Sequence, residues 1–312
     1  MEDLYEFNEA LKMNKKEIIA NTKRLAGNVY PHFDRITLYA DSSLGFLDMD
    51  RLTNKNAKGK KPKIIDCVMA YHPAYKFKLR IFQPSLENLQ YLCDAISTVP
   101  VNFSINYAEV TFDFISSEPL ELTTHINNHL VKTRRGESYH NQDRMKPLAE
   151  RTCYWGNRNQ HNFCPVTYSD RDSKIAHQPC AHLEFRIHGK ANCARHTISV
   201  PTDLLNFNFE RFFRQNAIFY VHPSKAVIGQ AIAADRNIFN KSKRCYEKIF
   251  ENRVKKKIHL LDPTPKISYQ YSVQELLSKI PGLKKILHTK KYKIINDKFT
   301  MNMQDALLKN MK

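Results

Sequence analysis

Two segments of the sequence carry mostly polar or charged side chains at every second position. Every second residue of an extended strand faces the same side. In residues 107–115 one side of such a strand is polar, with Tyr107, Glu109, Thr111, Asp113 and Ile115. In residues 180–188 the polar side consists of Cys180, His182, Glu184, Arg186 and His188. If the two strands are neighbours, three carboxylates and a histidine share one patch: Glu109, Asp113, Glu184 and His182.

Carboxylates gathered on one rigid sheet repel each other unless a cation joins them. Hard oxygen ligands favour Mg²⁺ or Mn²⁺, and a histidine shifts the preference towards Mn²⁺. Such an ion would polarise a phosphodiester. The alternative is an ordinary antiparallel sheet with one solvated face, on which Glu and Arg pair across strands.

The surrounding pattern predicts an α+β fold with a central, mostly antiparallel sheet and helices on one face. Alternation or apolar runs predict strands at 36–40, 77–82, 101–115, 151–156, 163–169 and 180–188. Helical spacing predicts helices after Pro84 and over 119–132, and loops are expected at 51–63 and 132–151. After Gly189 the pattern is helical. We therefore expect an α+β domain at 1–200, a helical extension packed on it at 201–262, and a basic helical tail at 263–312.

Three short motifs carry a resemblance. Thr152 to Arg158 reads T-x-Y-x-G-x-R, Tyr168 to Lys174 ends a strand as Y-x-D-x-x-x-K, and Glu184 to Gly189 reads E-x-R-x-x-G. Together with the acidic strand at 107–114, they resemble the core of rolling-circle replication initiators, the plasmid Rep and filamentous-phage gene II group of nicking proteins. The resemblance covers roughly residues 100–200.

This resemblance implies a function. Members of that family bind a replication origin and use a metal ion held by sheet carboxylates, while a tyrosine attacks one phosphodiester. By position, Glu109, Asp113 and Glu184 would be metal ligands, and Arg158, Lys174 and Arg186 would contact phosphate. Origin DNA, single-stranded or in a hairpin, would be the partner, together with a host helicase.

The nucleophile is the open point. Plasmid relatives place it on the helix that follows the E-x-R strand, but no tyrosine occurs between Tyr168 and Tyr220. Tyr168 and Tyr220 are therefore the candidates. The alternative is a catalytically inactive DNA- or RNA-binding module on the same fold.

The charge distribution also favours a nucleic-acid partner. The net charge is +18, and residues 241–312 contribute two thirds of it, with 18 basic and 6 acidic side chains. A concentrated basic segment favours a polyanion. We expect DNA contacts from Trp155, by stacking on a base, and from the following further basic residues: Arg171, Lys190, Lys255, Lys256 and Lys257.

Other classes of protein are disfavoured. The sequence has no G-x-G-x-x-G and no G-x-x-x-x-G-K motif, which argues against dinucleotide and P-loop nucleotide sites. Its apolar runs are shorter than the ~18 residues of a membrane helix, and the N-terminus does not look like a signal peptide. The seven cysteines are odd in number and form no C-x-x-C pair, as is typical of reduced thiols. We therefore expect a cytoplasmic protein without a membrane partner.

Overall fold

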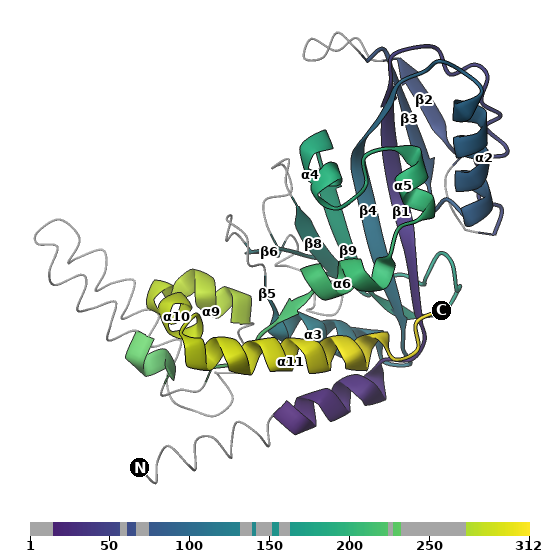
Figure 1. Cartoon of the computed structure of the whole chain (residues 1–312). Coiled ribbons are helices and arrows are strands. Elements are labelled where there is room, and N and C mark those ends of the chain that lie inside the picture. Colours follow the sequence, from purple (N-terminus) through teal and green to yellow (C-terminus); the bar gives the residue numbers. More distant parts are fainter. Residues whose placement is uncertain are drawn as a thin grey trace, which may run out of the picture.

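A computed structural model describes residues 15–56, 61–66, 75–131, 139–141, 152–155, 163–223, 227–231 and 273–312. Its centre is an eight-stranded sheet in the order β2-β3-β1-β4-β9-β8-β7-β6, and every paired neighbour is antiparallel (Figure 1). The strands are β1 (Val29–Ala40), β2 (Lys63–Asp66), β3 (Phe77–Phe82), β4 (Phe103–Ile115), β6 (Tyr139–Asn141), β7 (Cys153–Trp155), β8 (Cys164–Tyr168) and β9 (Cys180–His188). The predicted α+β class is confirmed.

The helices of the first two thirds of the chain begin at residues suited to helix ends. They are a helix over 15–25, α2 (Leu86–Ser97), α3 (Pro119–His129), α4 (Lys190–Arg195), α5 (Pro201–Leu205) and α6 (Phe209–Asn216). The Ser85 side chain caps α2 by accepting a hydrogen bond from the Asn88 backbone, and Asn88 bonds back to the Ser85 backbone. Pro119 opens α3, where its missing N–H costs nothing.

The apolar side of β4 and β9 forms the floor of the main core. Phe112 lies 4.8 Å from Phe213 of α6, and Phe185 lies 5.3 Å from Phe212, both between ring centroids. All four rings are buried. Burying a phenylalanine contributes about 1.5–3 kcal/mol, so this layer fixes α6 on one face of the sheet. The opposite face of the two strands carries their polar side chains.

The C-terminal helices are α9 (Val273–Lys279), α10 (Pro281–Leu287) and α11 (Lys290–Leu308). Phe299, Met303 and Leu307 of α11 belong to the same buried cluster as the sheet. The Thr300 hydroxyl accepts a hydrogen bond from the Phe219 N–H (3.0 Å) and donates one to the Phe219 carbonyl (2.6 Å). Phe219 lies in β10 (Ile218–Phe219), which pairs with β5 (Leu130–Val131). The last helix of the expected tail is therefore part of the main core and not a separate module.

A β-bulge interrupts β1 beside β4. Phe33 pairs with Val110 and Arg35 pairs with Glu109, so Asp34 is an extra residue. A bulge of this kind lets two consecutive side chains face the same side of a sheet. Phe33 lies in the apolar core, while Asp34 and Arg35 both line the polar side.

Among the described residues, no helix is both long and apolar enough to cross a membrane.

Candidate active site

The two charged strands are neighbours, as the site hypothesis required. In the register of β4 and β9, Thr111 pairs with Glu184 and Asp113 pairs with His182. Glu109 pairs with Arg186. The polar side chains of both strands therefore meet on one face, opposite the face that α6 covers.

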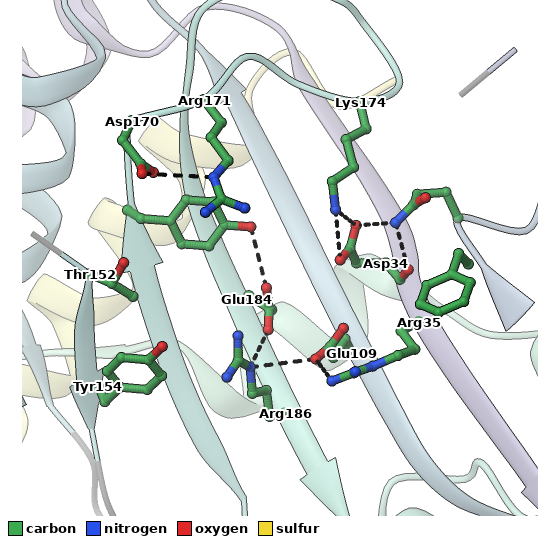
Figure 2. A pocket seen from close by; sticks show the side chains of 13 residues that line it. Asp34, Arg35, Glu109, Thr152, Tyr154, Asp170, Arg171, Lys174, Glu184 and Arg186 are labelled. Atoms are coloured by element: carbon green, nitrogen blue, oxygen red, sulfur yellow. Dashed lines mark hydrogen bonds and ion pairs between the residues drawn. The ribbon is translucent and has the colours of Figure 1, made fainter. Parts of the chain in front are cut away.

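A polar cavity of about 350 Å³ lies over this face (Figure 2). Its walls come from β1, β4, β7, β8, β9 and the loop after β8. The charged residues that line it are Asp34, Arg35, Glu109, Asp170, Arg171, Lys174, Glu184 and Arg186. Four basic and four acidic groups thus face a space large enough for a phosphate group and a metal ion.

The predicted four-residue patch divides into two separate groups. Glu109 and Glu184 join Asp34, with one carboxylate oxygen of each within 4.8 Å of the others. Asp113 and His182 join Cys180 under the same distance limit. The structure therefore does not bring all four predicted ligands to one ion.

Asp34 is the site residue that the sequence analysis missed. Strand alternation was recognised only from Ile36 onward, because the bulge at Asp34 breaks the alternation that marks a strand. The charged residues Asp34 and Arg35 between the apolar residues Phe33 and Ile36 were the only indication of it.

Two arginines hold the carboxylates of the first group. The Arg186 side chain donates from Nε to Glu184 and lies 3.5 Å from Glu109 Oε1. Arg35 donates from Nη2 to the same Glu109 oxygen and to the Tyr107 hydroxyl at 2.8 Å. Burial, followed by the repulsion of Glu184, raises the pKa of Glu109 to about 7 despite both arginines. Arg35 and Arg186 therefore offset the effect of burial on Glu109 only in part.

Lys174 pairs with the third carboxylate. Its Nζ lies 2.7 and 3.0 Å from the two oxygens of Asp34. Burial opposes ionisation of Asp34, but the attraction of Lys174 and its hydrogen bonds outweigh burial and lower the pKa of this carboxyl. Asp34 is therefore ionised and faces the cavity, as Figure 2 shows.

The second group is explained by hydrogen bonds. His182 Nδ1 lies 2.7 Å from Asp113 Oδ1, and His182 Nε2 lies 3.0 Å from the Arg171 carbonyl oxygen. Cys180 Sγ also lies 3.2 Å from Nε2. Because the carboxylate and the carbonyl are both acceptors, these contacts favour a buried imidazolium that donates from both ring nitrogens. Burial lowers the pKa of His182, but the bond from Asp113 outweighs it and raises the pKa overall. A ring with both nitrogens protonated has no lone pair for a metal.

This buried pair anchors the loop that follows β8. The Ser173 hydroxyl donates to Asp113 Oδ2 at 2.6 Å, while the Arg171 carbonyl is held by His182. The loop thereby presents Arg171 and Lys174 to the cavity. Asp113 and His182 are thus positioning residues for the loop, and their role as metal ligands stays a prediction.

Of the two candidate nucleophiles, Tyr168 lies at the cavity. Its hydroxyl is 3.3 Å from Glu184 Oε2, and its ring stacks on His182 at 4.3 Å between centroids. Burial and the neighbouring carboxylates, Glu184 first, raise its pKa well above the usual value. Tyr168 is therefore a neutral phenol that faces acidic groups.

Tyr220 lies elsewhere. Its backbone N–H bonds the His129 carbonyl (2.9 Å), and its side chain packs against the cluster formed by α9 and α10. It does not line the cavity. The prediction that Tyr220 could act on the same patch is wrong, because the helix-covered side of the sheet holds it.

The prediction that Trp155 stacks on a base is also wrong. Its ring is 1% exposed, and Nε1 donates to the Leu130 carbonyl at 3.1 Å on the helix-covered face. A ring enclosed in this way has no face for a base.

The other residues that were predicted to contact nucleic acid differ in position. Arg171, Lys174 and Arg186 line the cavity, Lys190 is exposed at the start of α4, and Arg158 and Lys255, Lys256 and Lys257 lie outside the described residues.

The donor set fits a small, hard cation. Asp34, Glu109 and Glu184 offer only carboxylate oxygens, the ligands that Mg²⁺ and Mn²⁺ prefer. The pKa of Glu109 is raised by burial first and by Glu184 second, so an added cation would favour its ionised form.

No protein-family model matches the chain, and no curated protein matches it. The candidate site consequently stands on its own geometry: three buried or half-buried carboxylates, a tyrosine hydroxyl and four basic side chains around one cavity.

Proposed function

We propose that the protein is a replication initiator of the rolling-circle type, which binds origin DNA in the cytoplasm and nicks one strand. The observation that supports this most is the Tyr168 hydroxyl, 3.3 Å from Glu184 in a cavity that also holds Asp34, Glu109 and four basic side chains. A nucleophile, a proton acceptor, a cation site and phosphate-binding groups are the components of a metal-assisted strand transfer.

The acidic group would hold Mg²⁺ or Mn²⁺ through Asp34, Glu109 and Glu184. When bound, the ion stabilises the negative charge that develops around phosphorus. Arg171, Arg186 and Lys174 line the same cavity and would orient the phosphodiester.

The reaction then follows from the position of Tyr168. Its oxygen attacks phosphorus and forms a new P–O bond, while its proton passes to Glu184 Oε2. The bond from phosphorus to the 3′ oxygen breaks, and that oxygen takes one proton from water. The products are a phosphotyrosine on the 5′ side and a free 3′ hydroxyl.

A specific observation favours a second candidate, an inactive DNA- or RNA-binding module. The Tyr168 hydroxyl faces a carboxylate, and burial and negative charge raise its pKa. A phenol in that environment is a poor nucleophile unless a cation enters.

The test is a nicking assay with the full chain. The substrate is a supercoiled plasmid that carries the DNA flanking the protein's own coding sequence, with Mn²⁺, and the products are run on a denaturing gel. We expect a protein-linked 5′ end, with peptide mapping of the adduct to Tyr168. Tyr168→Phe should reduce the rate by at least about 10³-fold, because the ring stays and only the nucleophile is lost.

Tyr220→Phe is the matched control and should nick like the unmodified chain. Retarded but uncut DNA, unchanged by Mn²⁺ or by Glu184→Ala, would reject nicking in favour of the binding module. An adduct on another tyrosine would reject the assignment of Tyr168.

A further inference from the structure

The cavity side of the sheet continues beyond the cavity as an open basic surface. Moving from β4 towards the β2 edge, most cavity-side positions are occupied by aromatic and basic side chains, with Thr37 and Ile65 between them. We call the following five residues the basic face: Tyr107, Tyr39, Lys78, Arg80 and Lys63. Strand register makes them continuous. Thr37 pairs with both Tyr107 and Arg80, Tyr39 pairs with Lys78, and Lys63 pairs with Arg80.

Each aromatic ring of the basic face has a cation beside it. Lys78 Nζ lies 5.5 Å from the centroid of the Tyr39 ring, and the Arg35 guanidinium carbon lies 4.6 Å from that of Tyr107. Both tyrosines are half-buried. The Tyr107 ring also meets His188 edge-on at 4.5 Å, and the Tyr39 ring lies 6.1 Å from that of Tyr75, both between centroids. Aromatic rings between basic side chains are the arrangement with which proteins stack bases and bind the phosphates between them.

Within the described part of the chain, the charge of the basic face is not balanced by carboxylates. The cavity-side positions of β2 and β3, and of β1 from Arg35 to Tyr39, carry no carboxylate. Among the described residues, Lys63, Lys78 and Arg80 have no ion-pair partner. A solvated face in which Lys and Glu simply alternate would pair them across strands, and this face does not.

Arg80 adds an independent observation. Its Nε is buried and donates no hydrogen bond to any described residue. A buried N–H without an acceptor costs about 1–3 kcal/mol. An acceptor supplied by a ligand, such as a phosphate oxygen, would remove that cost.

We propose that the basic face binds a single-stranded stretch of nucleic acid, with bases on Tyr39 and Tyr107 and phosphates on Lys78 and Arg80. The direction of the strand rests on the proposed function, because Arg35 both lies over Tyr107 and lines the cavity, so the bound strand leads to the candidate cutting site. A duplex is disfavoured as occupant because its base faces are already stacked on each other. Single-stranded binding itself requires no cut.

The test separates binding from chemistry. Binding of a labelled oligothymidine of about 12 nucleotides, a length within the usual site sizes, is measured by fluorescence anisotropy in EDTA over a range of salt concentrations. Tyr39→Leu should weaken binding by about fivefold or more, the equivalent of losing one stacked base, with an unchanged salt dependence. Tyr39→Phe keeps the ring and should bind within about twofold of the unmodified chain.

Arg80→Gln should act differently. Losing one phosphate contact should lower the slope of log K against log salt concentration by about 0.7. Lys23→Gln is the matched charge control, because Lys23 is exposed on the helix over 15–25 and is not part of the basic face. The salt dependence of binding by this variant should equal that of the unmodified chain. Thermal melting of each variant confirms that it is folded.

Two results would overturn the inference. One is unchanged binding and slope in folded Tyr39→Leu and Arg80→Gln. The other is a duplex of equal length that binds as tightly as the single strand. If the basic-face variants behave as expected and no nick forms with Mn²⁺, the surface assignment stands and the proposed nicking function fails.

Discussion

Glu109 and Glu184 lie on adjacent strands with carboxylate oxygens within 4.8 Å of each other. Arg35 and Arg186 contact them, yet the pKa of Glu109 is raised to about 7, by burial first and by Glu184 second. Two carboxylates this close in a buried site oppose each other's ionisation, and a bound cation would favour the ionised form of both. This pair of carboxylates therefore supports a prediction of metal binding that can be tested without DNA.

Mn²⁺ should stabilise the folded protein. At a concentration about 100 times its Kd, a ligand that binds only the folded state adds about 2.7 kcal/mol to the free energy of unfolding. Asp34→Asn should reduce Mn²⁺ affinity at least tenfold, because it replaces one of three charged carboxylate ligands by a neutral amide. Isothermal titration calorimetry measures the affinity, and thermal melting measures the stabilisation.

Asp297→Asn is the control for that experiment, since Asp297 is exposed on α11 and far from the acidic group in the chain. Equal Mn²⁺ affinity in the Asp34 and Asp297 variants would contradict the site.

Asp113→Asn should show that the two groups of the divided patch have different roles. It should lower the stability of the fold and leave Mn²⁺ affinity nearly unchanged. The change leaves the buried His182 imidazolium without its counter-charge, and breaking a buried ion pair costs about 3–5 kcal/mol. Because Asp113 is not assigned as a ligand, Mn²⁺ affinity should stay within about twofold. Urea unfolding gives the stability, and calorimetry gives the affinity. A loss of Mn²⁺ binding that matches Asp34→Asn would restore Asp113 to the ligand set.

His129 should make stability depend on pH. It is buried, and burial followed by the repulsion of His125 lowers its pKa to about 3. The unfolded chain binds this proton near pH 6.5 and the folded chain does not, so the contribution is complete above pH 6.5 and decreases as pH falls towards 3. At pH 5 the loss should be about 2 kcal/mol.

The measurement compares the unmodified chain with His129→Gln, so that other titrating groups cancel. The difference in free energy of unfolding between the two should be smaller by about 2 kcal/mol at pH 5 than at pH 7.5. A pH-independent difference would mean that folding does not change the pKa of His129.

Gly27 should not tolerate alanine. An added Cβ would lie 2.9 Å from the Ile115 carbonyl oxygen, which is backbone and accepts a hydrogen bond from Gly27 N–H at 2.8 Å. Overpacking of this kind costs about 1–3 kcal/mol. At exposed Gly45, the nearest atom to an added Cβ is Ser43 Oγ at 3.8 Å, so Gly45→Ala should change stability by less than about 0.5 kcal/mol. Chemical denaturation compares the two.

Regular alternation could be predicted from the sequence, and interruptions of it could not. The strands at 180–188 and 77–82 were predicted with the bounds that β9 and β3 have, because polar and apolar residues alternate there without a break. The first half of β1 was missed because Pro31 and the extra residue Asp34 interrupt its pattern. The bulge that hid the strand is also what turns Asp34 into the cavity.

Contacts between side chains far apart in the chain could be predicted less well than the face of the sheet on which each side chain lies. The alternation correctly placed Asp113 and His182 on the polar face with Glu109 and Glu184. It could not show that the Arg171 carbonyl and Ser173 would come from the loop to engage His182 and Asp113, since those contacts depend on loop conformation. Faces follow from local periodicity, whereas pairing within a face depends on tertiary structure.

The strand order has a consequence for how the chain is synthesised. β9 lies between β4 and β8, although both of those strands precede it in the chain. On a ribosome, β4 and β8 must wait with unpaired edges until β9 emerges and inserts between them. Exposed strand edges are templates for aggregation, and such long-range pairing is slow. A nascent chain released before residue 188 would lack both its central strand and Glu184, so the acidic group exists only once the sheet is complete.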